Sequence, residues 1–180
     1  MDVTQEKQLL ERLCQKDPAA MRWLYDRYSP SLMGVCRRYL PKKADAEDAL
    51  QDVFIRIFEK IKTFRQLDGS SLQGWMTRIA VNLCISKLRK RKVLDFITLQ
   101  DAQVLYQEEE PDLDQFSQET IMQAIGALPD GYRTVLNLYV FDRMTHREIA
   151  SLLGISEGTS ASQLHRARGL LWKKLKETKP

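Results

Sequence analysis

Long apolar runs and clusters of metal-binding side chains are both missing from this 180-residue sequence. Its longest apolar runs fall far short of the ~20 residues that a membrane-spanning helix needs. The N-terminal segment MDVTQEKQLLERL is charged and lacks the apolar core of a signal peptide. These absences argue against a membrane-spanning or secreted protein and predict a cytoplasmic location.

Cysteine and histidine are scarce and scattered. Cys14, Cys36 and Cys84 lie far apart, and His146 and His165 are the only histidines. Without a C-x-x-C motif or a Cys/His cluster, the sequence predicts no zinc site, no disulfide framework and no cofactor. Each cysteine falls in a helical pattern, where we expect a small buried apolar residue.

Charge is distributed unevenly along the chain. Residues 1–92 hold 19 Lys and Arg against 11 Asp and Glu, residues 93–118 hold seven acids and no base, and residues 119–180 hold nine bases and six acids. The three net charges are +8, −7 and +3, within an overall charge of +4. The length allows one domain or two, and this pattern favours two modules that face polyanions, joined by a segment that does not.

The first 92 residues show helical periodicity. Asp17-Pro18 predicts an N-cap followed by a proline at the first helical position, opening a helix to about Tyr28. Ser29-Pro30-Ser31 is expected to break this helix and to start another, which ends before Pro41. The strongest periodic segment is 44–64, whose apolar residues have the spacing of one buried helical face: Ala46, Ala49, Leu50, Val53, Phe54, Ile57, Phe58 and Ile61.

A loop from Thr63 to Ser71 precedes the last helix of this half, residues 72–92. Five of the last six residues of that helix are Lys or Arg. Its expected buried residues are Trp75, Ile79, Leu83 and Leu88. Because the whole half shows little strand signal, we predict an all-α bundle for residues 1–92.

The periodicity weakens over residues 93–118. An acidic run and a proline predict a linker without a core, which could span at most about 90 Å when extended. Helices are then expected at about 119–128 and 132–142. They precede the segment THREIASLLGISEGTSASQLHRAR, residues 145–168.

This last segment has the outline of a helix-turn-helix. Ile149, Ala150 and Leu153 predict the inner face of its first helix. Gly154 suits a left-handed turn, and Ser156 can cap the second helix. One side of the second helix is expected to face inward: Ser160, Leu164, Ala167 and Leu171. The opposite side carries Thr159, Ser162, Gln163 and Arg166.

Polar Ser160 is a misfit on the inward side. We expect its hydroxyl to bond to a carbonyl of the preceding turn, or the packing there to be looser. A helical hairpin with a merely solvated polar face is the alternative to a DNA-binding element.

Three motifs in series resemble the extracytoplasmic-function group of bacterial sigma factors, the promoter-recognition subunits of RNA polymerase. Residues 45–54 (DAEDALQDVF) resemble the family's second conserved region. Trp75 with residues 78–82 (RIAVN) resembles the signature of its promoter-melting helix. Leu128-Pro129 with residues 145–168 resembles its C-terminal helix-turn-helix. The resemblance covers about residues 10–92 and 119–176.

The resemblance implies two helical domains. Residues 1–92 would be sigma region 2, which binds core polymerase and recognises and opens the −10 element. Residues 119–180 would be region 4, which recognises the −35 element. The two elements lie about 70 Å apart, at ~34–36 Å per turn of DNA, a distance that the linker 93–118 can span. In the family this linker passes through the active-site and RNA-exit channels of the polymerase.

The implied partners are core RNA polymerase (β′ and β subunits), promoter DNA and an anti-sigma factor, often membrane-bound in this family. No catalytic residue, cofactor or small-molecule substrate is implied. The resemblance assigns core-polymerase docking to Asp48, Gln51 and Asp52, on the exposed side of the most periodic helix. Carboxylates there would meet a basic helix of the β′ coiled coil. The alternative is a solvated charged face.

For the −10 element, Asn82 corresponds to a position that helps hold a flipped base. The candidates in the preceding loop are Phe64, Arg65, Ser70 and Ser71. Phosphate contacts are expected at the basic helix end, whose alternative role is solubility: Lys87, Arg89, Lys90, Arg91 and Lys92. Trp75 is expected in the core rather than as a stacking platform.

For the −35 element, the predicted contacts to bases and phosphates are Thr159, Ser162, Gln163 and Arg166. The chain departs from the family at three positions. It has Ala161 and Gln163 where many members carry lysine and arginine, and Ser160 where valine is usual. Fewer charges should weaken unspecific attraction, and Gln163 would favour adenine over guanine.

Two other functions fit parts of the pattern. A helix-turn-helix regulator that acts without polymerase would need a sensor or receiver domain. A serine recombinase would need an α/β domain with a nucleophilic serine and several arginines. The helical, basic first half favours neither.

Overall fold

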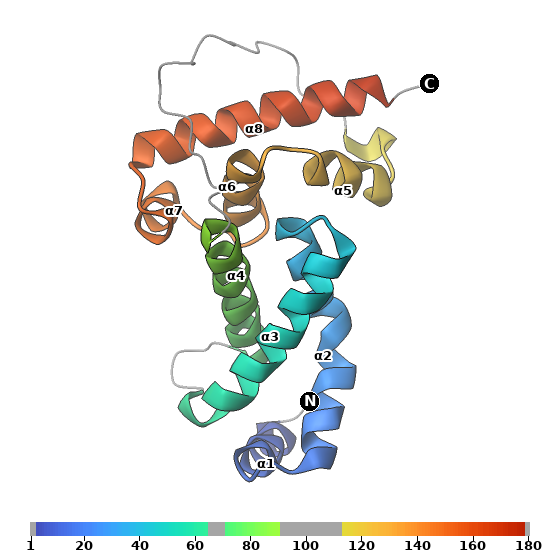
Figure 1. Cartoon of the computed structure of the whole chain (residues 1–180), viewed down its shortest axis with the longest axis vertical. Coiled ribbons are helices and arrows are strands. Elements are labelled where there is room, and N and C mark those ends of the chain that lie inside the picture. The colour runs from blue at the N-terminus through green and yellow to red at the C-terminus, as the bar shows by residue number, and fades with distance from the viewer. Residues whose placement is uncertain (1–2, 65–70, 91–112, 179–180) are drawn as a thin grey trace. The chain divides into compact units, whose positions relative to one another are not determined.

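The computed structural model describes residues 3–64, 71–90 and 113–178. Within these ranges the chain forms α-helices, short 3-10 helices and the turns between them (Figure 1), which confirms the predicted all-α class. The chain divides into two compact units, Met1–Ser86 and Lys87–Pro180. None of the described helices combines the length and the continuous apolar character that crossing a bilayer requires.

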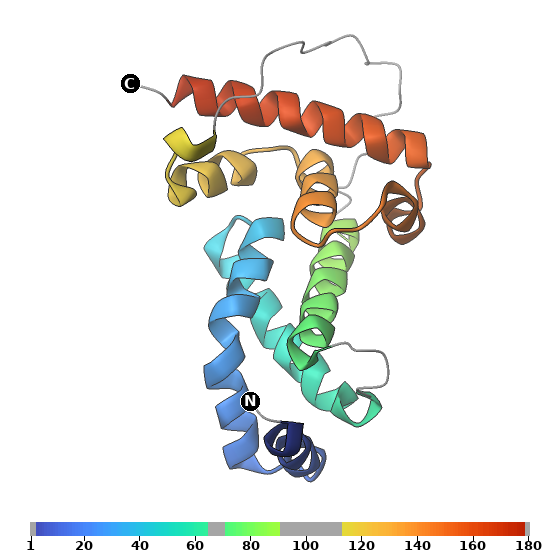
Figure 2. The same cartoon turned by 180° about the vertical axis from the view of Figure 1, so that it is seen from behind.

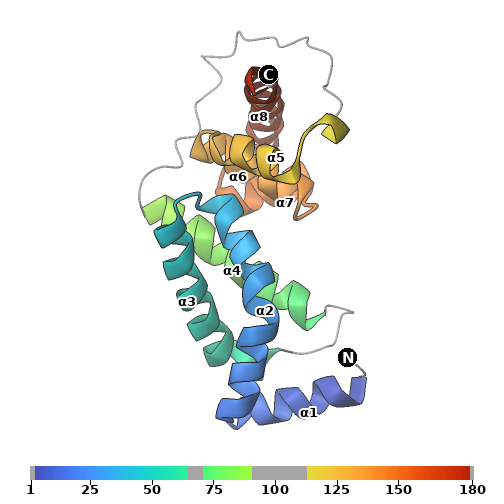
Figure 3. The same ribbon diagram turned by 90° about the vertical axis from the view of Figure 1, so that its right-hand side faces the viewer.

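The described residues of the first unit form these helices: α1 (Val3–Cys14), α2 (Pro18–Tyr39), α3 (Lys43–Lys60), the 3-10 helix η1 (Ile61–Thr63) and α4 (Leu72–Lys90). The last turn of α4 passes the boundary between the units. Helix α2 packs along α3, and Figure 3 shows α1 crossing the N-terminal end of α2. Asp17 caps α2 as predicted, since its Oδ1 accepts from the amides of Ala19 (2.8 Å) and Ala20 (3.4 Å).

Helix α2 runs without a break through Pro30, so the predicted break at residues 29–31 is wrong. Proline removes one amide donor, but Pro30 is exposed, so water can reach the carbonyl left without that donor. Leu24 before it and Leu32 after it are both buried in the core. Packing on both sides of the proline therefore holds one continuous helix together.

The predicted buried face of α3 is confirmed except at Phe58, which is only half-buried. In α4 the buried face differs from the predicted one. The residues expected inside at 75, 79 and 83 are half-buried, and only Leu88 is confirmed as buried. The residues of α4 that are buried in the core form the neighbouring apolar stripe of the helix: Leu72, Met76, Ala80, Val81, Cys84, Ile85 and Leu88. Both stripes are apolar, so periodicity alone could not choose between them.

The three cysteines are free, and the burial predicted for all of them is found at two. Cys36 and Cys84 are buried, whereas Cys14 is half-buried. Among the described residues, no group of three or more metal-binding side chains comes together.

The second unit contains η3 (Leu113–Gln115), α5 (Gln118–Gly126), α6 (Asp130–Val140), α7 (His146–Leu153) and α8 (Glu157–Glu177). Helices α5, α6 and α7 all pack on α8, the longest of these (Figure 2). Ser117 caps α5 by accepting a hydrogen bond from the Thr120 amide at 3.1 Å.

A buried arginine joins α5 to α6. Arg133 is only 3% exposed, and its Nη1 donates to the carbonyl oxygens of Gly126 and Leu128 at the end of α5. Its Nη2 forms an ion pair with Asp130 in the first turn of α6. Burial lowers the pKa of Arg133 to about 10, so the guanidinium is still charged at neutral pH. The charge thus satisfies carbonyls that the end of a helix leaves unpaired.

Candidate nucleic-acid interface

The first helix of the helix-turn-helix starts at a capping box. Thr145 Oγ1 accepts from the Glu148 amide at 3.3 Å, and Glu148 Oε2 accepts from the Thr145 amide at 2.8 Å. These bonds from the backbone and hydroxyl of Thr145 hold the pKa of Glu148 below its usual value. The T-x-x-E spacing that signals such a box is visible in the sequence but was missed.

The turn between α7 and α8 has the predicted geometry. Gly154 adopts φ 72° and ψ 37°, the left-handed region, and its amide donates to the Ala150 carbonyl at 2.8 Å. Ser156 Oγ accepts from the Thr159 amide at 3.0 Å and so caps α8. The predicted inner face of α7 is also confirmed, since all three of its residues are buried: Ile149, Ala150 and Leu153.

Ser160 follows neither of the two expected solutions. It is fully buried, and its Oγ lies 3.0 Å from Nδ1 of His146, across the helix-turn-helix. The imidazole in turn stacks on Tyr139, with ring centroids 4.8 Å apart and planes 23° from parallel. Ser160 is therefore a polar residue on the buried side of α8 because it forms a hydrogen bond to α7, and a ring of α6 stacks on the histidine that it bonds.

Gln163 is buried, with 1% of its surface exposed, so its predicted place on the outward face is wrong. At 100° per residue it lies only about 60° around α8 from Ser160. Because three helices pack on α8, its buried sector is wide enough to include both. All five buried polar or charged residues among those described belong to this second unit: Arg133, Thr134, Asn137, Ser160 and Gln163.

The other three predicted −35 residues are partly accessible on α8. Thr159, Ser162 and Arg166 are half-buried. Ser162 Oγ donates to the Thr159 carbonyl at 3.0 Å, so this hydroxyl keeps acceptor capacity for a partner. They form a short polar strip that begins in the first turn of α8.

The predicted −10 residues are not all accessible. Asn82 is exposed on α4, and Ser71 is exposed just before it, where its Oγ accepts from the Gly74 amide at 3.1 Å. Phe64 is only 9% exposed and packs on Trp75 with ring centroids 5.3 Å apart, so it is a core residue rather than a loop contact. Although Phe64 stands next to the loop in the sequence, burying its aromatic ring against Trp75 is energetically favourable. Two loop candidates, Arg65 and Ser70, lie outside the described residues.

The basic end of α4 is partly accessible. Arg89 and Lys90 are exposed, whereas Lys87 is half-buried. Arg91 and Lys92, together with residues 93–112 of the predicted linker, lie outside the described residues.

The predicted docking residues share one exposed face of α3. Asp48, Gln51 and Asp52 are all exposed. Ile55, which follows them at helical spacing, is 58% exposed, an unusually open position for a large apolar side chain. The sequence did not predict this exposed position, because the periodic apolar residues of α3 define the opposite, buried face.

Comparison with known proteins agrees with this two-part architecture. Residues 24–93 match the family model for Sigma-70 region 2, and residues 118–171 match the model for Sigma-70, region 4. The chain is 31% identical to the ECF RNA polymerase sigma factor SigW of Bacillus subtilis, over 95% of this chain and 97% of that protein. It is 30% identical to the RNA polymerase sigma-H factor of Pseudomonas aeruginosa, over 95% and 94%.

Solved structures show the same fold. RpoE of Bartonella quintana, solved with the anti-sigma factor NepR, aligns with a TM-score of 0.54 at 23% identity, over 88% of this chain and 98% of that one. CnrH, solved with the cytosolic domain of CnrY, aligns with a TM-score of 0.52 at 20% identity, over 95% and 97%.

Two helical units carrying region 2 and region 4 define a protein of the sigma-70 class. The chain belongs to its extracytoplasmic-function (ECF) group, the alternative sigma factors that direct RNA polymerase to specific promoters.

Proposed function

We propose that the two halves of this sigma factor divide promoter recognition, residues 1–92 acting on the −10 element and residues 119–180 on the −35 element. The observation that carries the proposal is the complete helix-turn-helix of the second unit. Its capping box, its left-handed Gly154 and its cap at Ser156 fix the start of α8. A rigid helix presented in this way can enter the major groove of duplex DNA.

In the second unit, Thr159, Ser162 and Arg166 contact bases and phosphates of the −35 element. Hydroxyl groups can donate and accept at base edges, and a guanidinium binds guanine or phosphate. Gln163 is left out because it is buried. Its predicted preference for adenine therefore has no support from the geometry.

In the first unit, Asn82 holds an unpaired base of the −10 element, and the basic end of α4 contacts phosphates. Ser71 and Asn82 lie at the start and near the middle of α4, roughly 16 Å apart along its axis at 1.5 Å per residue. Ser71 therefore acts at a different nucleotide from Asn82. The basic residues proposed to contact phosphates are Lys87, Arg89, Lys90, Arg91 and Lys92.

The exposed face of α3 docks on core polymerase. Asp48 and Asp52 supply negative charge for a basic partner, Gln51 adds an amide, and Ile55 gives the contact an apolar centre. Interfaces commonly combine a desolvated apolar contact with a polar rim.

The chain is proposed to act in the cytoplasm, without catalytic activity of its own, under the control of an anti-sigma factor. One protein of the same fold was solved with the anti-sigma factor NepR, and another with the cytosolic domain of CnrY. A purified anti-sigma partner that leaves run-off transcription by this chain unchanged would contradict this control.

Run-off transcription with purified core polymerase tests the central proposal. We expect promoter-dependent transcripts only when this chain is added. In a second arm, Asp48→Lys and Asp52→Lys are expected to weaken binding to the core, because two attractive charges become repulsive. Asp26→Lys, an equal charge change on exposed α2, is the control and should bind normally.

The outcomes separate the claims. No promoter-dependent transcript with active core would contradict the promoter-recognition proposal. Unchanged core affinity of the two α3 variants would remove the docking assignment and leave DNA recognition untouched.

A further inference from the structure

A groove of about 470 Å³ lies between α1 and the first turns of α2, both within the first unit. Pockets that bind small-molecule-sized groups usually have about 300–1,000 Å³. The residues that line it come from one face of each helix: Gln5, Gln8, Leu9, Arg12, Ala19, Ala20 and Trp23. None of them has been assigned a part in the contacts proposed above.

The groove has an apolar floor and an aromatic wall. Leu9 and Ala20 are buried beneath it, whereas Trp23 is 44% exposed. Tryptophan is highly buried on average in folded proteins, so an indole this open is unusual. Its ring meets Tyr28 edge-on, with centroids 6.4 Å apart and planes at 75°. An exposed indole can stack with a flat aromatic ligand.

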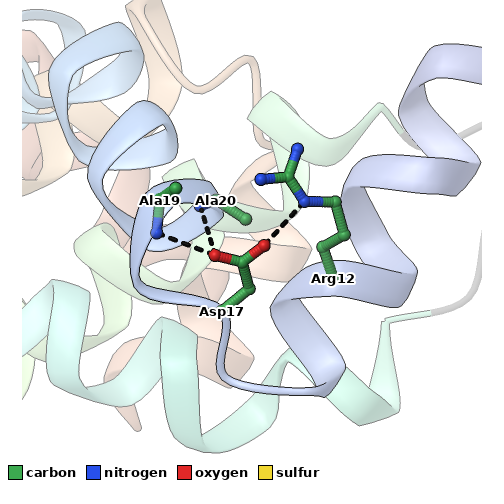
Figure 4. A network of polar contacts seen from close by, with 4 residues as sticks. All are labelled: Arg12, Asp17, Ala19 and Ala20. Carbon is green, nitrogen blue, oxygen red and sulfur yellow. Dashed lines mark hydrogen bonds and ion pairs between the residues drawn. The ribbon is translucent and has the colours of Figure 1, made fainter.

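The charge of the groove comes from Arg12, whose guanidinium is held in place. Its Nε donates to Oδ2 of Asp17 at 2.7 Å, while Oδ1 of Asp17 caps α2. In Figure 4 the bond to Asp17 starts from Nε of Arg12, and neither terminal nitrogen is joined to the carboxylate. The lining includes no carboxylate. The fixed guanidinium therefore favours an anion, phosphate above all, since its planar donors suit phosphate oxygens.

The third component is a pair of amide side chains, Gln5 and Gln8, one turn apart on α1. Gln8 is exposed at the groove. A side-chain amide offers both a donor and an acceptor, which matches the edge of a nucleobase. An aromatic wall, an amide and a fixed guanidinium, whose partner Asp17 binds Nε and lies outside the lining, are together the chemistry of a nucleotide site.

We propose that this groove binds one unpaired nucleotide of the melted promoter strand. The base stacks on Trp23, its edge meets Gln8, and its phosphate lies on Arg12. This inference rests on the proposed function, which supplies the melted DNA. It adds a contact made by α1 and α2, separate from Asn82 and the basic end of α4.

The direct test uses the full chain with Trp75→Phe and Trp172→Phe, so that Trp23 is the only tryptophan. Titration with a fluorescein-labelled single-stranded DNA octamer should quench Trp23 with the same midpoint as the rise in anisotropy. Because stacking on an aromatic ring contributes to the affinity for a base, Trp23→Ala should weaken octamer binding about five- to a hundredfold. Trp23→Phe, which keeps an aromatic ring, should weaken it less. Circular dichroism confirms that each variant is folded.

Arg12 offers a matched control. Arg22 is also an exposed arginine whose Nε pairs with an aspartate, Asp26, but it does not line the groove. Arg12→Ala should weaken octamer binding and reduce the slope of log K against log salt by about 0.7, the value for one phosphate on a single strand. Arg22→Ala should leave the slope unchanged.

Three results would overturn the proposal. The first is no quenching of Trp23 by the octamer, and the second is equal effects of Arg12→Ala and Arg22→Ala. The third is that thymidine monophosphate or an RNA octamer binds as tightly as the DNA octamer. Each could occur while run-off transcription with core polymerase remains normal. Failure of the groove is therefore distinguishable from failure of the sigma-factor function.

Discussion

The turn of the helix-turn-helix gives the sharpest stability prediction. Gly154 has a left-handed backbone, and a Cβ added there would meet no atom within 4 Å. Replacing it by alanine therefore changes only the backbone energy. The left-handed conformation destabilises a residue with a Cβ by roughly 1–2 kcal/mol. Alanine also lowers the conformational entropy of the unfolded chain, which offsets about 0.4–1 kcal/mol of this loss. The second unit should lose about 1 kcal/mol, which corresponds to a melting-temperature shift of roughly 4–8 °C.

Gly158 is the matched control, four residues along and within α8. A Cβ there would meet only Ser156 Oγ at 3.8 Å, an ordinary contact. Gly158→Ala should therefore stabilise the second unit by about 0.5–1 kcal/mol, because glycine is unfavourable inside a helix. Gly154→Asn should cost less than Gly154→Ala, since asparagine tolerates the left-handed region.

Urea unfolding followed by the fluorescence of Trp172 measures these changes, because Trp172 lies on α8. Replacing Trp23 and Trp75 by phenylalanine in every variant restricts the signal to the second unit. Equal effects of alanine at positions 154 and 158, or a gain of stability at 154, would refute the reasoning.

Three further predictions concern the polar contacts of the second unit. Arg133→Met should cost about 2–3 kcal/mol, because two carbonyl oxygens and Asp130 lose a charged partner; a urea-measured loss below about 1 kcal/mol would contradict this. A double-mutant cycle between Ser160 and His146, with alanine at each, should give a coupling of about 0.5–1.5 kcal/mol, and zero coupling would disprove the bond. The pKa of Glu148 is lowered in the folded state, so its ionised carboxylate stabilises the unit above its ordinary pKa of 4.5 and ceases to do so as the pH falls through the folded value. Glu148→Gln should flatten this acid-side dependence in urea titrations at several pH values, and an unchanged slope would be inconsistent with the capping box.

Local signals in the sequence were sufficient for the start of α2, for the turn before α8 and for the buried face of α3. Asp17 before a proline predicted the start of α2, and Gly154 predicted the left-handed turn. The apolar stripe of α3 was predicted almost completely. These features depend on the conformational preferences of single residues and on spacing within one helix, which a sequence contains directly.

Contacts between helices decided the rest. Pro30 remains inside a helix because packing on both sides outweighs its lost hydrogen bond, and α4 buries one of two apolar stripes because of what lies against it. Gln163 is buried and Ser160 meets His146 because three helices converge on α8. The sequence by itself determined the order of the helices, the helix-turn-helix and the family resemblance, since these follow from local patterns. Only the tertiary structure decided which polar residues of α8 face outward, because that depends on neighbours distant along the chain.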